Sequence, residues 1–138
     1  MKQGAEKIFI IDDDFSFRKA VCTLLKDKGY QVAESSGRLD VIKSIIRENP
    51  DLVLLDLRMT EIDGEEILNS IKRKNLPFPV IIVSGSLNQV NRRLLRNHGA
   101  CDFLMKPAEK SELISKVQNA LNSVGSQRKN IPESQNLY

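Results

Sequence analysis

Short, uninterrupted runs of apolar residues alternate along this chain with segments in which apolar residues recur at helical spacing. The apolar runs are IFII (8–11), LVLL (52–55), VIIV (80–83) and FLM (103–105), and YQVAE (30–34) is a weaker candidate of the same kind. Strands that are apolar on both faces are typical of a parallel sheet covered on both sides. The runs therefore predict five buried strands.

A segment with the apolar spacing of an amphipathic helix follows each strand candidate. Gly29, the Asn49–Pro50 pair, Pro77 and Gly99 mark the ends of the first four helices, and Ser111 is a candidate N-cap of the fifth. The five stripes are Phe17, Val21, Leu24 and Leu25; Leu39, Ile42, Ile45 and Ile46; Ile67, Leu68 and Ile71; Leu87, Val90, Leu94 and Leu95; and Leu113, Ile114, Val117 and Leu121.

The strand–helix alternation, repeated five times, predicts an α/β fold: a doubly wound parallel sheet of five strands with helices on both faces. The crossovers are expected to be right-handed, whereas periodicity does not give the strand order. The periodicity ends near residue 122. We therefore expect one domain over residues 1–122 and a flexible polar tail, or a truncated linker, over residues 123–138.

The composition argues against several classes of protein. Of the 138 residues, 41% are hydrophobic and 28% are charged, which is too apolar for a disordered chain. The net charge of +3 is spread along the sequence and requires neither nucleic acid nor a membrane as a partner. No apolar run reaches the roughly 18 residues that cross a bilayer, and no secretory signal is visible. We expect a soluble, cytoplasmic domain in which Cys22 and Cys101 are buried free thiols.

Polar residues follow four of the predicted strands directly. Ligands of an open parallel sheet bind beyond the carboxyl ends of its strands, so these side chains are expected to converge. In strand order they are Asp12, Asp13 and Asp14; Asp56 and Arg58; Ser84, Gly85 and Ser86; and Lys106, which precedes Pro107.

The convergent residues favour one kind of chemistry. Adjacent carboxylates repel one another by roughly 1 kcal/mol per pair in water, a repulsion that a bound cation would offset. Asp12 and Asp13 supply the hard oxygen ligands that suit Mg²⁺, and Asp56 can act as a carboxylate nucleophile. Lys106 and Ser84 would then hold the oxygens of an incoming phosphoryl group. The set indicates phosphorylation of an aspartate.

Five short motifs occur in order at the ends of the predicted elements: IIDDD (10–14), LVLLD (52–56), DG (63–64), IIVSG (81–85) and DFLMKP (102–107). Together they resemble the receiver domain of two-component response regulators, over roughly residues 6–122. The resemblance implies a flavodoxin-like (βα)5 fold with strand order 2-1-3-4-5. It also implies a signalling domain that assists only its own phosphorylation and dephosphorylation, rather than an enzyme.

The resemblance implies a role for each site residue. Asp56 resembles the phosphoacceptor, Asp13 a direct Mg²⁺ ligand, and Asp12 a ligand that acts largely through water. Asp56 and the backbone carbonyl of Arg58 would complete the metal site, in which Mn²⁺ could substitute for Mg²⁺. Lys106 would pair with the phosphoryl group.

The resemblance also implies a switch and its partners. Ser84 and Phe103 occupy the switch positions, and the Lys106–Pro107 peptide bond is expected to be cis. The phosphoryl donor would be a phosphohistidine on a histidine kinase or on a histidine phosphotransfer protein. The surface of the fourth helix and fifth strand would contact an output domain or form a receiver homodimer. No contact with nucleic acid or membrane by this domain is implied.

The sequence departs from the family pattern at a few positions. Thr60 stands where proline is common, Ala108 follows Pro107 where phenylalanine is frequent, and phenylalanine replaces the frequent tyrosine at position 103. Arg58 and Ser86 lie at positions that tune the phosphoryl lifetime, which therefore stays open.

Several residues allow a plainer interpretation. Asp14 suits a helix cap better than a third metal ligand, and Ser84 could cap the helix that follows it. His98 suits a helix end rather than a metal or phosphohistidine site. The basic side chains of the fourth helix form a solvated face by default and an interaction surface as the alternative; they are Arg92, Arg93 and Arg96.

Two further functions compete with the signalling switch. A phosphatase that forms an aspartyl phosphate is disfavoured because the chain is short and its best nucleophile follows the third strand. A protein-interaction module that ignores phosphorylation would not need the complete set of site residues.

Overall fold

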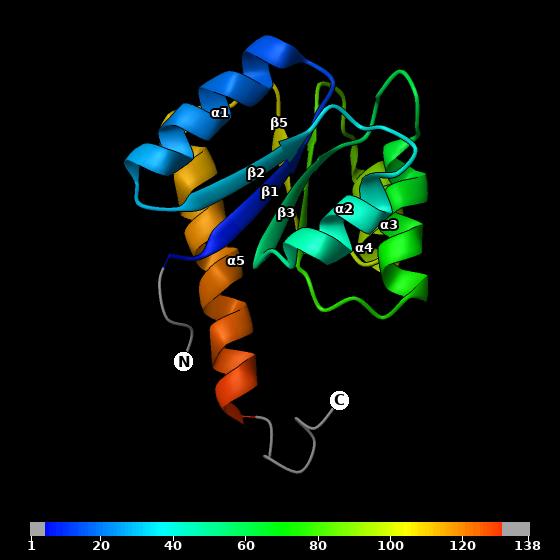
Figure 1. The fold of residues 1–138 in the computed structure, drawn as a ribbon. Coiled ribbons are helices and arrows are strands. Elements are labelled where there is room, and N and C mark those ends of the chain that lie inside the picture. Colours follow the sequence, from blue (N-terminus) through cyan, green and yellow to red (C-terminus); the bar gives the residue numbers. More distant parts are fainter. Residues whose placement is uncertain (1–4, 131–138) are drawn as a thin grey trace.

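The computed structural model describes residues 5–130, without the side chains of residues 89, 90 and 124–130. Its core is a five-stranded parallel sheet with the strand order β2-β1-β3-β4-β5, as the resemblance implies (Figure 1). The strands are β1 (Lys7–Ile11), β2 (Gln31–Ser35), β3 (Leu52–Asp56), β4 (Val80–Ser84) and β5 (Asp102–Met105). The prediction of an α/β doubly wound fold is confirmed.

Helices cover both faces of the sheet. They are α1 (Phe15–Asp27), α2 (Val41–Glu48), α3 (Gly64–Arg73), α4 (Gln89–Asn97) and α5 (Lys110–Asn130). In Figure 1, α1 and α5 lie on one side of the sheet, and α2, α3 and α4 lie on the other. None of the helices within residues 5–130 has both the length and the apolar character needed to cross a bilayer.

The core forms one layer on each side of the sheet. Ile8 and Ile10 of β1 pack with residues of α1 and α5, whereas Phe9 and Ile11 pack with residues of α2, α3 and α4. Successive side chains of a strand point to opposite faces, so a strand that is covered on both sides must be apolar at every position. This packing explains the uninterrupted apolar runs.

The second helix is shorter than its apolar stripe predicts. It begins at Val41, and its buried residues are Val41 and Ile45, one turn apart. Leu39 lies before the helix and is 78% exposed, and Ile46 is 48% exposed. The apolar residues of this segment could face the core in two ways. The helix adopts the one that buries Val41 together with Ile45.

The last helix differs from its prediction at both ends. It begins at Lys110, so Ser111 lies inside the helix and is not its N-cap. It continues to Asn130, beyond the end of the apolar periodicity near residue 122, so residues 123–130 of the expected flexible polar tail or truncated linker are helical; residues 131–138 lie outside the described range. Once a helix is nucleated by packing, each added residue gains a hydrogen bond at little further cost.

Both cysteines are free thiols, but only Cys22 is buried. Cys101 directly precedes β5 and is exposed, so the prediction that it is buried was wrong. Its buried neighbours in the sequence are Ala100 on one side and Phe103 and Leu104 of β5 on the other, whereas Cys101 itself is exposed.

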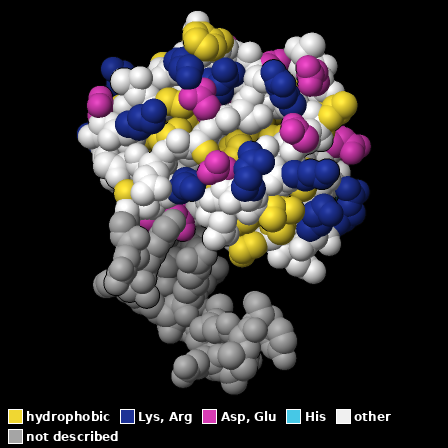
Figure 2. Space-filling model, viewed as in Figure 1, with side chains coloured by type: hydrophobic (Ala, Val, Ile, Leu, Met, Phe, Trp, Pro, Cys, Tyr) yellow, Lys and Arg dark blue, Asp and Glu magenta, His cyan; other side chains and the backbone are white. Residues whose placement is uncertain are grey.

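Charged side chains of both signs are interspersed over most of the face seen in Figure 2. This distribution agrees with the modest net charge of +3.

Candidate functional site

The predicted site residues meet at the carboxyl end of the sheet. Asp12 directly follows β1, Asp56 ends β3, Ser84 ends β4, and Lys106 directly follows β5. The strand pairing continues slightly beyond the strands, because the backbone N–H of Lys106 donates to the carbonyl of Ser84 (2.9 Å). The backbone N–H of Asp12 likewise donates to the carbonyl of Ser35 (3.1 Å). Adjacent parallel strands therefore hold these side chains in register.

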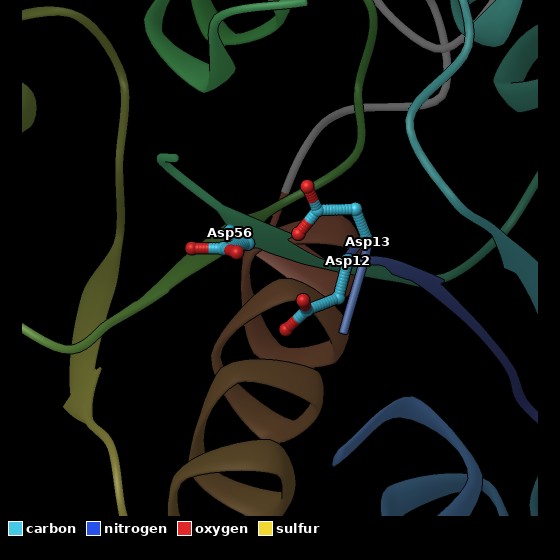
Figure 3. Close-up of side chains that lie close together, drawn as sticks. All are labelled: Asp12, Asp13 and Asp56. Atoms are coloured by element: carbon cyan, nitrogen blue, oxygen red, sulfur yellow. The ribbon is translucent and has the colours of Figure 1, made fainter. Parts of the chain in front are cut away.

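Three carboxylates form the acidic centre of the site. Asp12, Asp13 and Asp56 each place one oxygen within 4.8 Å of the others, at the ends of β1 and β3 (Figure 3). Asp12 and Asp56 are only 1% and 6% exposed, whereas Asp13 is exposed to solvent. Burial brings this negative charge into a poorly solvated environment, where like charges repel more strongly than in water.

Lys106 lies beside the two buried carboxylates. Its Nζ atom is 2.7 Å from Asp12 Oδ2 and 3.6 Å from Asp56 Oδ2. The contact with Asp12 is an ion pair, and no hydrogen bond to the buried Asp12 Oδ2 is found among the described residues. Burial lowers the pKa of Lys106, but the adjacent Asp12 and then Asp56 outweigh it, and the net pKa is raised. Lys106 is therefore a firmly charged ammonium group.

The ionised form of Asp56 is disfavoured by its surroundings. Burial, together with the negative charge of Asp12, raises the pKa of Asp56 from 3.8 to about 6. The backbone N–H of Arg58 donates to Asp56 Oδ1 (3.2 Å) and partly opposes this effect. One lysine therefore does not fully offset the charge of the buried carboxylates.

The donor set fits a hard divalent cation. Three carboxylate oxygens lie close enough to share one ion, and carboxylate oxygen is the ligand that Mg²⁺ prefers in proteins. Asp12 Oδ2, which is buried with no hydrogen bond from the described residues, and Asp56, whose pKa is raised, would both gain from the added positive charge.

Two local features shape the backbone around the carboxylates. Asp14 caps α1, since its Oδ1 accepts a hydrogen bond from Phe17 N (3.1 Å), which confirms the plainer interpretation of this residue. Asp63 caps α3 in the same way, with Glu65 N as donor. A Cβ atom at Gly64 would lie 2.3 Å from the carbonyl oxygen of Asp56. The Asp63–Gly64 motif thus starts α3 and lets it pass closely behind Asp56.

Ser84 is buried at the end of β4. Its hydroxyl lies close to the backbone of Ser86, with Oγ 3.3 Å from Ser86 N and 3.4 Å from Ser86 O. The N-cap of α4 is Asn88, whose Oδ1 accepts from Asn91 N (2.9 Å), so the alternative that Ser84 caps this helix was wrong. Among the described residues, the Ser84 hydroxyl makes only these long hydrogen bonds, which it could exchange for one to a stronger acceptor.

Phe103, on β5, is 1% exposed and packs beneath α4. The guanidinium groups of Arg92 and Arg96 lie 5.7 and 5.1 Å from the centre of its ring. The default interpretation of the basic helix as a solvated face is therefore incomplete, because two of its arginines contact an aromatic ring. His98 is the C-cap residue of α4, the helix-end position that the sequence predicts. The Lys106–Pro107 peptide bond is cis.

Sequence reasoning missed two residues that hold Asp12 and Asp13 in place. Arg18 donates from Nη1 to the backbone carbonyl of Asp12 (2.6 Å) and from Nε to Glu34 Oε1 (2.8 Å). Thr60 donates to Asp13 Oδ2 from both its backbone N–H and its hydroxyl, each at 2.9 Å. The threonine in place of a common proline was a signal for the second contact, whereas the sequence gives no signal for the first.

Comparison with known proteins identifies the family. Residues 8–118 match the family model of the response regulator receiver domain. The chain belongs to this family. Its members serve two-component systems, in which receiver domains pair with histidine kinases and output domains.

Receiver segments of longer proteins are similar to this chain. It is 33% identical over 132 residues to the probable transcriptional regulator ycf27 of Porphyridium aerugineum, covering 94% of this chain and 54% of that protein. It is 34% identical over 114 residues to the transcriptional regulatory protein ZraR of Klebsiella oxytoca, covering 83% of this chain and 26% of that protein. The chain thus spans about half or less of the length of these relatives.

Solved receiver structures share the fold. A signal receiver domain from Vibrio parahaemolyticus superposes with a TM-score of 0.87 at 26% identity, covering 94% of this chain and 99% of that chain. NtrX from Brucella abortus, crystallised with ADP, gives a TM-score of 0.81 at 29% identity and covers 91% of this chain and 28% of that chain.

Proposed function

We propose that this receiver domain accepts a phosphoryl group on Asp56 in a Mg²⁺-dependent reaction. The donor is a phosphohistidine on a histidine kinase or a histidine phosphotransfer protein. The observation that carries the proposal is the convergence of Asp12, Asp13, Asp56 and Lys106 at one edge of the sheet. Family membership over residues 8–118 supports it.

Asp56 is the nucleophile in the proposed reaction. One of its carboxylate oxygens attacks the phosphorus, the bond from phosphorus to the histidine nitrogen breaks, and the imidazole leaves with that electron pair and takes up a proton. Asp56 then carries a mixed anhydride. A bound cation would lower the pKa of Asp56 and so keep its carboxylate ionised and available for the attack.

The cation, which would be Mg²⁺ or, as a substitute, Mn²⁺, would be held by Asp12, Asp13, Asp56 and the backbone carbonyl of Arg58. A bound cation would supply positive charge against the combined charge of the carboxylates and the phosphoryl oxygens. Because their oxygens lie within 4.8 Å of an oxygen of Asp56, Asp12 and Asp13 would place the cation next to that carboxylate.

Lys106 and Ser84 would bind the phosphoryl oxygens after transfer. The ammonium of Lys106 is already 3.6 Å from Asp56 Oδ2 and needs only a small movement to reach an oxygen attached to that carboxylate. The Ser84 hydroxyl would exchange its long contacts with Ser86 for a charged acceptor.

Movement of Ser84 toward the phosphoryl group would be transmitted to Phe103 and the surface of α4 and β5. Ser84 ends β4, Phe103 lies on the neighbouring strand, and Arg92 and Arg96 contact its ring from α4. Leu94 and Met105 are exposed apolar residues on these same two elements. We propose this surface as the contact with an output domain or with a second receiver, and cytoplasm as the location, which two free cysteines support.

The labelling of Asp56 tests the proposal. Wild-type protein incubated with a small phosphodonor and Mg²⁺ is expected to form an acid-stable, base-labile acyl phosphate, and Asp56→Asn is expected to abolish it. Asp14→Asn is the matched control, since Asp14 is adjacent to the site but caps α1. Labelling that survives in Asp56→Asn, or that does not need a divalent cation, contradicts the proposal. Partner binding that ignores phosphorylation would instead support an interaction module.

A further inference from the structure

Thr60 is bonded twice to a carboxylate of the acidic centre. Its backbone N–H and its hydroxyl both donate to Asp13 Oδ2, and each distance is 2.9 Å. Hydrogen bonds to an ionised acceptor are shorter and stronger than those between neutral groups. Thr60 lies 47 residues from Asp13 in the sequence, so the pair joins the loop between β3 and α3 to the end of β1.

The loop that carries Thr60 is itself anchored. Gly64 N donates to Leu57 O (2.9 Å) and closes the base of the loop. Met59 packs closely against Gly37. The Sδ atom of Met59 occupies the space that a Cβ atom at Gly37 would need. Thr60 therefore presents its donors from a loop with fixed ends, not from a freely moving one.

The same loop also contacts Asp56, another carboxylate of the acidic centre. Arg58 N donates to Asp56 Oδ1 (3.2 Å), two residues before Thr60. One short segment thus bonds to both Asp56 and Asp13. The contact at Thr60 fixes the position of Asp13 relative to Asp56 and to the Arg58 backbone.

Asp13 needs such a restraint more than the other two carboxylates. It is exposed, whereas Asp12 and Asp56 are enclosed by their surroundings. Repulsion from these two neighbours favours rotation of an exposed carboxylate into solvent. Figure 3 shows Asp13 with one oxygen directed toward Asp56 and the other directed away from it.

We propose that Thr60 is a positioning residue for the divalent cation. Its two donors hold Oδ2 of Asp13 and leave the second carboxylate oxygen for the ion. This inference rests on the proposed metal-dependent function of the site. Proline, which is common at this position in the family, has neither an N–H nor a hydroxyl, so it could make neither bond.

Magnesium affinity of matched variants tests the proposal. Thr60→Ser keeps both donors, Thr60→Val keeps the shape and the N–H but loses the hydroxyl, and Thr60→Pro loses both. The dissociation constant is measured by isothermal titration with MgCl₂, and thermal melting without Mg²⁺ shows whether each variant is folded. Loss of a group that orients a metal ligand costs about 10–100-fold in affinity, so we expect about a tenfold loss in Thr60→Val and more in Thr60→Pro.

A double-mutant comparison separates positioning from general stability. Thr60→Ser is expected to bind Mg²⁺ like the wild type, and Thr60→Val is expected to have no further effect when Asp13→Asn is already present. If Thr60→Val binds Mg²⁺ as tightly as the wild type, or more tightly, the positioning role is wrong. If the wild type itself binds no Mg²⁺, the proposed function fails first, and this inference fails with it. Thr60→Val decides the question if Thr60→Pro does not fold.

Discussion

Two clusters of charge at the carboxyl end of the sheet differ in how they are compensated. Around Glu34, on β2, opposite charges meet: Arg18 Nε and Lys19 Nζ each lie 2.8 Å from one of its oxygens. The hydrogen bond from Lys19, opposed by burial and aided by Arg18, lowers the pKa of Glu34 to about 2. Around Asp56, like charges meet in a buried place, and the pKa rises to about 6.

The two clusters differ in whether the protein's own side chains balance the charge. The Glu34 cluster is balanced by the protein's own side chains. Among the described residues, the Asp56 cluster has the ammonium group of Lys106 against two buried carboxylates, and we propose that a ligand cation supplies the further positive charge. Arg18 links the two clusters, since it also donates to the backbone carbonyl of Asp12.

The largest effect on stability is expected from the loss of Lys106. In Mg²⁺-free buffer, Lys106→Met is expected to lower the free energy of unfolding by about 3 kcal/mol, because it leaves buried carboxylates without their partner. Added Mg²⁺ should recover part of this loss. Lys7→Met is the control: Lys7 pairs with Glu48 near the surface, and such a pair contributes less than about 1 kcal/mol. Equal losses in chemical denaturation of the two variants would contradict the comparison.

The pH dependence of stability should show the direction in which the pKa of Asp56 is shifted. Its pKa lies above the ordinary value of 3.8, so the native state binds the proton more tightly, and its contribution to stability is lost as the pH rises through about 6. In Mg²⁺-free buffer at pH 7.5 we expect Asp56→Asn to be more stable than the wild type by about 1–2 kcal/mol. The difference should shrink toward pH 4 in urea denaturation, and a difference that is constant with pH would show that ionisation is not its cause.

Glu34 should behave in the opposite way. Its pKa of about 2 lies below the ordinary 4.5, so its contribution is complete above pH 4.5 and is lost as the pH falls toward 2. We expect Glu34→Gln to lose about 1 kcal/mol at pH 7, with little difference from the wild type at pH 2.5. A variant as stable as the wild type at pH 7 would mean that the Glu34 cluster is not balanced in the way that the contacts indicate.

The smallest effect on stability is expected at Phe103 of β5, where two arginines of α4 lie over the aromatic ring. Contacts between a cation and an aromatic ring contribute about 0.5–1 kcal/mol, so Arg96→Ala and Arg92→Ala should each lower the free energy of unfolding by that amount. Arg93→Ala is the matched control: Arg93 is an exposed arginine of the same helix, whereas Arg92 and Arg96 lie over the ring. Thermal unfolding of the three variants measures the difference, and identical losses would remove these contacts from the account.

The sequence predicted those parts of the site that strand ends determine. Asp12, Asp56, Ser84 and Lys106 directly end or follow buried strands, and parallel pairing leaves them only one edge at which to meet. The strands themselves were predictable, because burial on both faces requires an uninterrupted apolar run.

Contacts that depend on loop conformation or helix rotation were not predictable. The bond between Thr60 and Asp13 requires the shape of the β3–α3 loop, which has no periodic signal. The position of Arg92 and Arg96 over Phe103 depends on how α4 is rotated against the sheet. Leu39 was placed on a buried face because the apolar stripe of the second helix has two possible phases.

The pKa of Asp56, measured with and without Mg²⁺, tests the central claim most directly. In ¹³C NMR titrations of the side-chain carboxyl carbons, with Asp56→Asn used for assignment, we predict a value of about 6 without the cation. Saturating Mg²⁺ should then lower it by more than about one unit, because an adjacent positive charge favours the ionised form. A value near the ordinary 3.8 without Mg²⁺, or one that Mg²⁺ leaves unchanged, would contradict the claim that this cluster is completed by a cation.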